Sequence, residues 1–191
     1  MTTDDVRKLI SNNQLQQALT ACDQLALPDD FKSKLLALKA SYREYNNHRI
    51  DGDMRSDDLE ITRAGITKRI LLFLSEYELV CITDLKNNFV ALTDNIENNA
   101  THEDKAVVVD EAKQITADLQ SIDTAEKKED VKPGVIKRIG DFIAKFHDKD
   151  STQSKVLATI KDGVSVVQEL GKKYNSIAQW FMLPQIPTVF L

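Results

Sequence analysis

The acidic residues with the most suggestive spacing are Asp51, Asp53 and Asp57, which alternate as the ligands of a calcium-binding loop do. Such a loop needs a glycine at its sixth position and a glutamate at its twelfth, where this chain has Ser56 and Thr62. The same residues are explained by a turn between two helices, with Ser56 beginning the second helix. We therefore expect a turn here and no calcium site.

Histidine and cysteine occur without the spacing of a metal site. His48, His102 and His147 each stand alone in a polar segment near a predicted helix end, with no second histidine four residues away. Cys22 and Cys81 lie far apart in apolar helical contexts, which favours buried free thiols over a disulfide or a redox pair. The sequence predicts no metal site and no cofactor.

Carboxylates are abundant, but none is arranged as a catalytic pair. Asp57 and Asp58 are adjacent, as are Glu129 and Asp130, so on a helix the two members of each pair point in different directions. The chain has neither a glycine-rich loop for phosphate nor the Gly-x-Ser-x-Gly motif of a serine nucleophile. We expect a protein that is not an enzyme.

The overall charge argues against nucleic acid as the main partner. The 191 residues include 25 basic and 30 acidic side chains, which gives a formal net charge of -5. Arg63, Lys68 and Arg69 share a predicted helix with Phe73 and Tyr77, but these two aromatic residues fall on its apolar stripe. We expect both rings in the core, where they cannot stack on bases.

The first residues of the chain are polar and acidic, unlike the basic and then apolar segments of a secretory signal. No window of the sequence approaches eighteen uncharged apolar residues, the length that a membrane-spanning helix needs. We therefore expect a cytoplasmic protein.

Apolar residues recur at three- and four-residue spacing along nearly the whole chain, which predicts an all-α fold. Residues 1–78 are predicted to contain four amphipathic helices. The third begins behind Pro28, where Asp29 and Asp30 suit the positive end of the helix dipole. The fourth helix either continues past residue 78 with a change of buried face or kinks near residues 81–83.

The rest of the chain is also predicted to be helical. Residues 79–124 read as a helical hairpin, with Thr101 and Asp104 as a capping pair for its second helix. Residues 125–132 are charged and lack large apolar side chains, which is typical of a linker. Residues 133–191 are predicted to form two further helices and an apolar tail. The expected architecture is a four-helix bundle, a helical hairpin and two C-terminal helices.

The C-terminal tail is apolar and interrupted by prolines. Its large side chains, exposed together, would form a patch larger than a soluble monomer usually tolerates. Either the tail folds back to close the bundle, or it contacts a protein partner or a membrane surface. The candidate contact residues are Trp180, Phe181, Ile186, Val189, Phe190 and Leu191.

The first four predicted helices also form a recognisable series: a short helix, a helix with an Ala-Leu pair, a long helix ending in a basic and then glycine-containing turn, and a closing helix with a buried Leu-Leu pair. The residues that carry this series are 6–10, 15–19, 38–45, 50–53, Arg63, Ile66, Arg69, Ile70, Leu71 and Leu74. Over residues 1–78 the chain resembles the bacterial effector-associated domains, small helical adaptors likened to the death-fold superfamily.

The resemblance implies an adaptor that associates with like domains, either a second copy of itself or an effector, within a prokaryotic conflict or antiphage system. The effector would be a protease, a nuclease or a nucleotide-hydrolysing switch. Charged residues outside the apolar stripes are the candidate protein-interaction residues: Arg43, Arg49, Asp57, Asp58 and Arg63. The alternative is a small membrane-acting effector, whose C-terminal helices and apolar tail would engage a bilayer.

Overall fold

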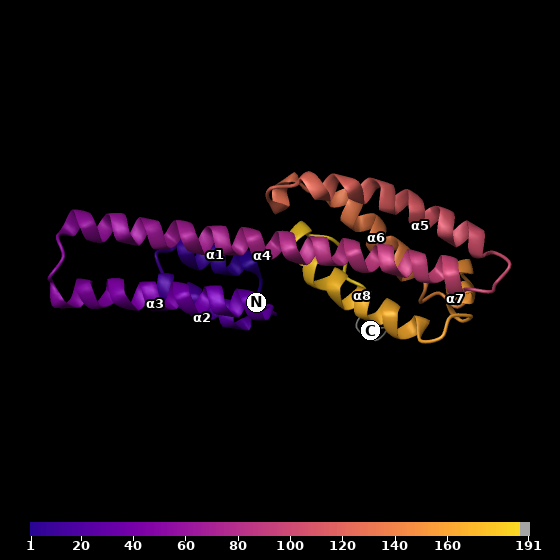
Figure 1. Cartoon of the computed structure of the whole chain (residues 1–191), viewed down its shortest axis with the longest axis horizontal. Helices are drawn as coiled ribbons and strands as arrows, with labels where there is room; N and C mark the ends of the chain where they lie inside the picture. Colours follow the sequence, from indigo (N-terminus) through magenta and orange to yellow (C-terminus); the bar gives the residue numbers. More distant parts are fainter. Residues whose placement is uncertain (188–191) are drawn as a thin grey trace. The chain divides into compact units, whose positions relative to one another are not determined.

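The structure is a computed structural model that describes residues 1–187. Within this range the chain contains α-helices and 3-10 helices and no strand, which confirms the predicted all-α fold (Figure 1). The α-helices are α1 (Thr3–Ser11), α2 (Leu15–Ala21), α3 (Asp29–Asp51), α4 (Ser56–Asn99), α5 (Lys105–Leu119), α6 (Pro133–Lys145), α7 (Thr152–Leu157) and α8 (Gly163–Ala178). The 3-10 helices are η1 (Cys22–Gln24), η2 (Gln120–Thr124), η3 (Lys128–Asp130) and η4 (Gln179–Phe181).

The chain divides into two compact units, and each is described by itself. Unit 1 is Met1–Glu78 and unit 2 is Leu79–Leu191. The division falls within α4, so its first part belongs to unit 1 and its second part to unit 2. The sequence left a kink near residues 81–83 as one of two possibilities, and α4 instead continues as one helix from Ser56 to Asn99.

Unit 1 contains α1, α2, α3 and the first part of α4. Helix α2 is shorter than predicted: it ends at Ala21, η1 follows, and the backbone is extended from Leu25. Pro28 disfavours helical geometry at Leu27, the residue before it, which argues against a helix that reaches the predicted end near Leu27. Helix α3 then starts at Asp29, as predicted. The core of unit 1 includes Val6, Ile10, Leu15, Leu19, Cys22, Phe31, Leu35, Ile66, Ile70, Phe73, Leu74 and Tyr77.

Unit 2 packs the second part of α4 with α5, α6, α7 and α8. Three phenylalanine rings form edge contacts at its centre: the Phe89 and Phe142 centroids lie 5.4 Å apart, and those of Phe142 and Phe146 lie 5.2 Å apart. The regular apolar stripes of the sequence meet in this one core. Its fully buried members include Ile82, Leu85, Leu92, Ile96, Leu119, Ile136 and Ile139.

The boundaries within unit 2 differ from the prediction in three places. Residues 133–187 contain three α-helices and not two, because Asp162 adopts a left-handed conformation (φ 59°) that separates α7 from α8. The backbone N–H of Thr101 donates to Thr159 Oγ1, and the N-cap Asp104 makes no side-chain cap, so the predicted capping pair does not form. Residues 125–132, predicted to be a linker, lie inside unit 2.

Candidate protein-interaction surface

Helices α3 and α4 of unit 1 form an antiparallel hairpin whose register is marked by two polar contacts. Lys34 Nζ lies 2.7 Å from Glu76 Oε2, and Arg69 Nη1 lies 3.5 Å from Ser41 Oγ. Seven residues forward along α3 therefore correspond to seven residues back along α4. The hydrogen bond to Glu76 raises the pKa of Lys34, so its ammonium group stays charged near neutral pH.

The part of the hairpin nearest its loop, residues 43–66, is here called the hairpin arm. In Figure 1 the loop between α3 and α4 lies beyond α1 and α2. Ile50 and Ile61 are accordingly 69% and 71% exposed. Gly52 closes the loop in a left-handed conformation (φ 68°), where its N–H donates to the His48 carbonyl at the end of α3. The turn predicted from the sequence is present.

The five predicted interaction residues all lie on the hairpin arm. Two are exposed on α3 and three lie in the first turns of α4, where one is exposed and two are half-buried. In chain order they are Arg43, Arg49, Asp57, Asp58 and Arg63. The hairpin thus brings together charged residues from either side of its loop.

Two of these five residues have polar partners on their own helix or in the loop. Arg49 donates to Asn46 Oδ1 at 3.0 Å, and Asp58 accepts from Arg55 Nε at 3.2 Å. Both are short-range contacts between an exposed arginine and a half-buried side chain, which contribute about 0–1 kcal/mol and exchange readily with water or a partner. The charged groups of Arg49 and Asp58 therefore remain accessible to another protein.

A groove of about 310 Å³ lies between α3 and α4 on the same hairpin. Leu38 and Phe73 are buried beneath it, and Leu72, which is 57% exposed, stands at its edge. Lys34 and Glu76 lie together at one end, and the remaining lining residues are Ala37, Ser41 and Arg69. The groove offers an apolar surface with charged edges, which suits contact with a protein side chain.

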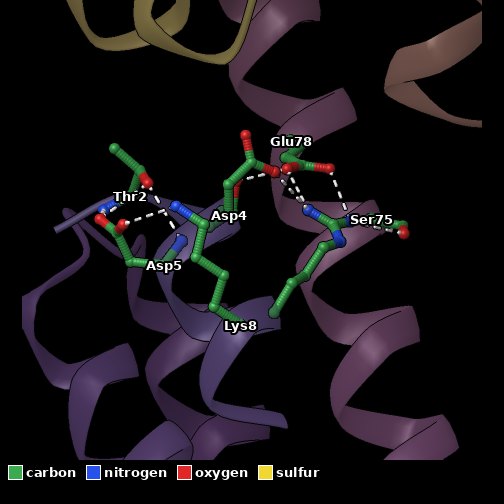
Figure 2. Close-up of polar contacts among 8 residues, drawn as sticks. Thr2, Asp4, Asp5, Lys8, Ser75 and Glu78 are labelled. Carbon is green, nitrogen blue, oxygen red and sulfur yellow. Dashed lines mark hydrogen bonds and ion pairs between the residues drawn. The ribbon is translucent and has the colours of Figure 1, made fainter. Parts of the chain in front are cut away.

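The N-terminal helix is attached to α4 by a buried carboxylate. The Glu78 side chain is 1% exposed and accepts hydrogen bonds from Thr3 Oγ1 and from both terminal nitrogens of Arg7, at 2.5 Å and 2.9 Å for the latter (Figure 2). Arg7 also donates to Ser75 Oγ at 3.3 Å. The sequence pattern does not single out Glu78. The available signal was that Glu78 follows the core residue Leu74 by four residues, which places both on the same face of the helix.

The start of α1 is closed by a reciprocal cap, also drawn in Figure 2. Thr2 Oγ1 accepts from the Asp5 N–H at 3.2 Å, and the Asp5 carboxylate accepts from the Thr2 N–H at 2.9 Å. These hydrogen bonds, the backbone one first, lower the pKa of Asp5. Helix α1 is therefore positioned at its start by this cap and along its side by Glu78.

The sequence also raises the histidine, cysteine and acidic residues of residues 1–187 as candidate metal ligands or reactive groups. Residues 1–187 contain no group of three or more His, Cys, Asp or Glu side chains that could hold a metal ion. Cys22 is a buried free thiol, and Cys81 is half-buried. Burial raises the pKa of Cys22 to about 11, so its thiol is neutral and a poor nucleophile at physiological pH.

The structure accounts for three of the six tail residues predicted as contact candidates. Ile186 is 4% exposed and belongs to the core of unit 2, so its predicted role as a contact residue is corrected: apolar packing on unit 2 has already buried it. Trp180 and Phe181 are half-buried and pack against the same core. Val189, Phe190 and Leu191 lie outside the described residues.

Two polar side chains of α8 hold the tail residues Pro184 and Ile186 in place. The side-chain amide of Asn175 donates from Nδ2 to the Ile186 carbonyl and accepts at Oδ1 from the Ile186 N–H, each at 2.7 Å. Tyr174 donates its hydroxyl to the Pro184 carbonyl at 3.0 Å. None of the described helices has the length and apolar character needed to cross a membrane.

Comparison with known proteins agrees with the resemblance seen in the sequence. Residues 1–78 match the family model described as effector-associated domain 11, which confirms the predicted effector-associated domain in this part of the chain. The match covers 78 of the 191 residues and spans the same residues as unit 1. Neither a curated protein nor a solved structure matches the chain.

Proposed function

We propose that this protein is a non-enzymatic adaptor whose residues 1–78 bind a like domain carried by an effector. The match to an effector-associated domain is the observation that carries the proposal. The effector class is the one implied by the resemblance: a protease, a nuclease or a nucleotide-hydrolysing switch. We propose further that the adaptor acts in the cytoplasm, within a prokaryotic conflict or antiphage system.

The surface of unit 1 supports a recruiting role. The hairpin arm carries exposed charges of both signs beside exposed isoleucines, at Ile50 and Ile61. Isolated apolar residues are common on protein surfaces, but charged and apolar groups gathered on one projecting element are typical of an interaction site. The membrane-acting alternative has no comparable observation, because Ile186 is already buried in unit 2.

The test is to purify the tagged full-length chain from its own host and to cross-link the recovered partner through lysine side chains. The expected partner carries an effector-associated domain, and its cross-links should fall on lysines of unit 1, such as Lys8, Lys32 and Lys68. Partners without such a domain, or cross-links confined to the lysines of unit 2, would refute the proposal.

A matched pair of variants localises the contact on unit 1. Arg43→Glu with Arg49→Glu reverses two exposed charges of the hairpin arm. Lys149→Glu with Lys155→Glu makes the same change in net charge on unit 2, at two other exposed positions. Recovery of the partner should fall about tenfold or more for the first pair and stay unchanged for the second, since rim charges mainly set the rate of encounter.

A further inference from the structure

Helix α4 carries two acidic and two basic residues at matching intervals along its length. Asp57 precedes Lys68 by eleven residues, and Asp58 precedes Arg69 by the same number. Eleven residues are close to three full turns, so the members of each pair lie on one line along the helix, about 16 Å apart. One side of α4 is therefore acidic near its start and basic three turns later.

The residues between these charges are an exposed isoleucine and two small residues. Ile61 is 71% exposed, and Ala64 and Gly65 are also exposed. A methyl group added to Gly65 would meet no atom within 4 Å, so packing in the described structure does not require a glycine. Glycine inside a helix costs about 0.5–1 kcal/mol relative to alanine, and close approach of another backbone is a reason to keep one.

This arrangement is complementary to itself when two copies of α4 lie antiparallel. A two-fold axis at the level of residue 63 along the helix places Asp57 of one copy beside Lys68 of the other, and Asp58 beside Arg69. The same axis places Ile61 over the flat surface left by Gly65 of the other copy. A parallel arrangement would bring like charges together, which disfavours it.

We propose that a second copy of this chain binds here, through the same face of α4 and in antiparallel orientation. The inference rests on the proposed association of like domains and names one surface and one partner for it. Asp58 now binds exposed Arg55 at 3.2 Å, and Arg69 reaches Ser41 at 3.5 Å. Both are weak contacts that a partner can replace.

The symmetry makes the dimer isologous, with each contact formed twice. One helix face from each copy gives a small interface, so the dimer forms at high local concentration and dissociates on dilution. Such a contact suits an adaptor that gathers copies only when many are brought together.

A charge-swap experiment on the full-length chain tests the pairing. Sedimentation velocity at rising concentration should show a monomer–dimer equilibrium for the unmodified chain. Asp57→Lys with Asp58→Lys should weaken the dimer about tenfold or more, and so should Lys68→Glu with Arg69→Glu, because each change places like charges in contact. An equal mixture of the two double variants should dimerise again, as should the chain that carries all four substitutions.

The control for local damage is Asp29→Lys with Asp30→Lys. These two residues occupy the first turn of α3 as Asp57 and Asp58 occupy that of α4. Both double variants lose the favourable interaction of acids with a helix N-terminus. The α3 variant should dimerise like the unmodified chain.

Gly65→Gln separates dimerisation from folding. A glutamine should raise the stability of α4, since it replaces a glycine in a helix, yet its side chain should hold the partner away. We expect loss of the dimer without loss of helical content or melting temperature.

The pairing is overturned if the chain stays monomeric at the highest soluble concentration, or if it dimerises and the charge-swap mixture does not recover. Either result leaves the proposed function open to its own test, because recovery of an effector with a like domain does not require a dimer of this chain. Conversely, a dimer that behaves as expected with no effector recovered would support the pairing and refute effector recruitment.

Discussion

Units 1 and 2 are built from the same amphipathic pattern but expose their apolar residues differently. In unit 1 the exposed large apolar side chains, apart from Met1, all lie on α3 and α4: Leu36, Ile50, Ile61, Leu71 and Leu72. In unit 2 those among the described residues stand on four different segments: Val80, Val107, Val164 and Met182. Unit 1 concentrates its unburied apolar surface on one hairpin, and unit 2 scatters it.

The polar contacts of the two units differ in the same way. In unit 1 a buried carboxylate, Glu78, attaches the short helix α1. In unit 2 the side chain of Asn175 attaches the C-terminal tail to α8. The Glu78 contacts leave the α3–α4 hairpin exposed, whereas the Asn175 contacts hold the tail over an apolar surface of unit 2. A helical pattern in the sequence therefore does not distinguish a surface for partners from a core, and the tertiary contacts do.

The largest expected effect is loss of the unit 2 core in Phe142→Ala. Phe142 is fully buried and contacts the rings of Phe89 and Phe146. We expect destabilisation of about 3–5 kcal/mol, from lost burial and the cavity left behind. Hydrogen exchange resolved by segment should show faster exchange throughout α6. Leu72→Ala on the exposed hairpin is the control, with a change within about 0.5 kcal/mol. If Phe142→Ala and Leu72→Ala destabilised the protein equally, the contrast between a buried core in unit 2 and an exposed hairpin in unit 1 would be refuted.

The next effect is release of α1 in Arg7→Ala. Removal of the guanidinium removes the ion pair between Arg7 and the buried Glu78 carboxylate, and because the Arg7 side chain is 26% exposed we expect a cost of about 2–3 kcal/mol. Exchange of the α1 amides should accelerate most. Lys34→Ala removes the partner of exposed Glu76 and should cost about 0–1 kcal/mol. If the two substitutions cost the same, Glu78 has no special part in attaching α1.

The starts of several helices were predictable because their chemistry is local. Pro28 is the N-cap residue of α3, directly before Asp29, and Pro133 is the first residue of α6, where proline is favoured. The break between α7 and α8 was missed, because Leu157 and Ile160 keep a helical spacing up to it. The only local signal was the turn-forming pair at Asp162.

The candidate surface was predictable only in part. Charged residues such as Arg43 and Asp57 could be named because they fall outside the apolar stripes. Nothing in the sequence placed them on one hairpin arm, since that depends on the antiparallel register of α3 and α4. The burial of Glu78 was equally hidden, because it depends on Arg7, which is seventy-one residues away along the chain.

A smaller effect is expected in unit 2 from Asn175→Ala. This change removes both 2.7 Å hydrogen bonds to the Ile186 backbone and should cost about 1–2 kcal/mol of tail docking. Limited proteolysis of residues 179–187 should then run about tenfold faster, since cleavage follows the population of the open form. Gln185→Ala is the control, because Gln185 is exposed and its contact with Asn175 is long, at 3.4 Å. An unchanged cleavage rate would mean that apolar packing alone holds the tail.

The smallest effect concerns pH and the cap of α1. The hydrogen bonds from Thr2 lower the pKa of Asp5 below its ordinary value of 3.8 in the folded state. A carboxyl group with a lowered pKa stabilises the fold fully above the unfolded value, and this stabilisation is lost as the pH falls below 3.8 and through the folded pKa. Amide exchange in α1, corrected for its intrinsic pH dependence, should therefore increase in that range. Titration of Asp5 should cause no such increase in the amide exchange of α6. In Asp5→Asn the step should disappear, and a step that persists in this variant would assign the acid sensitivity of α1 to another carboxyl group.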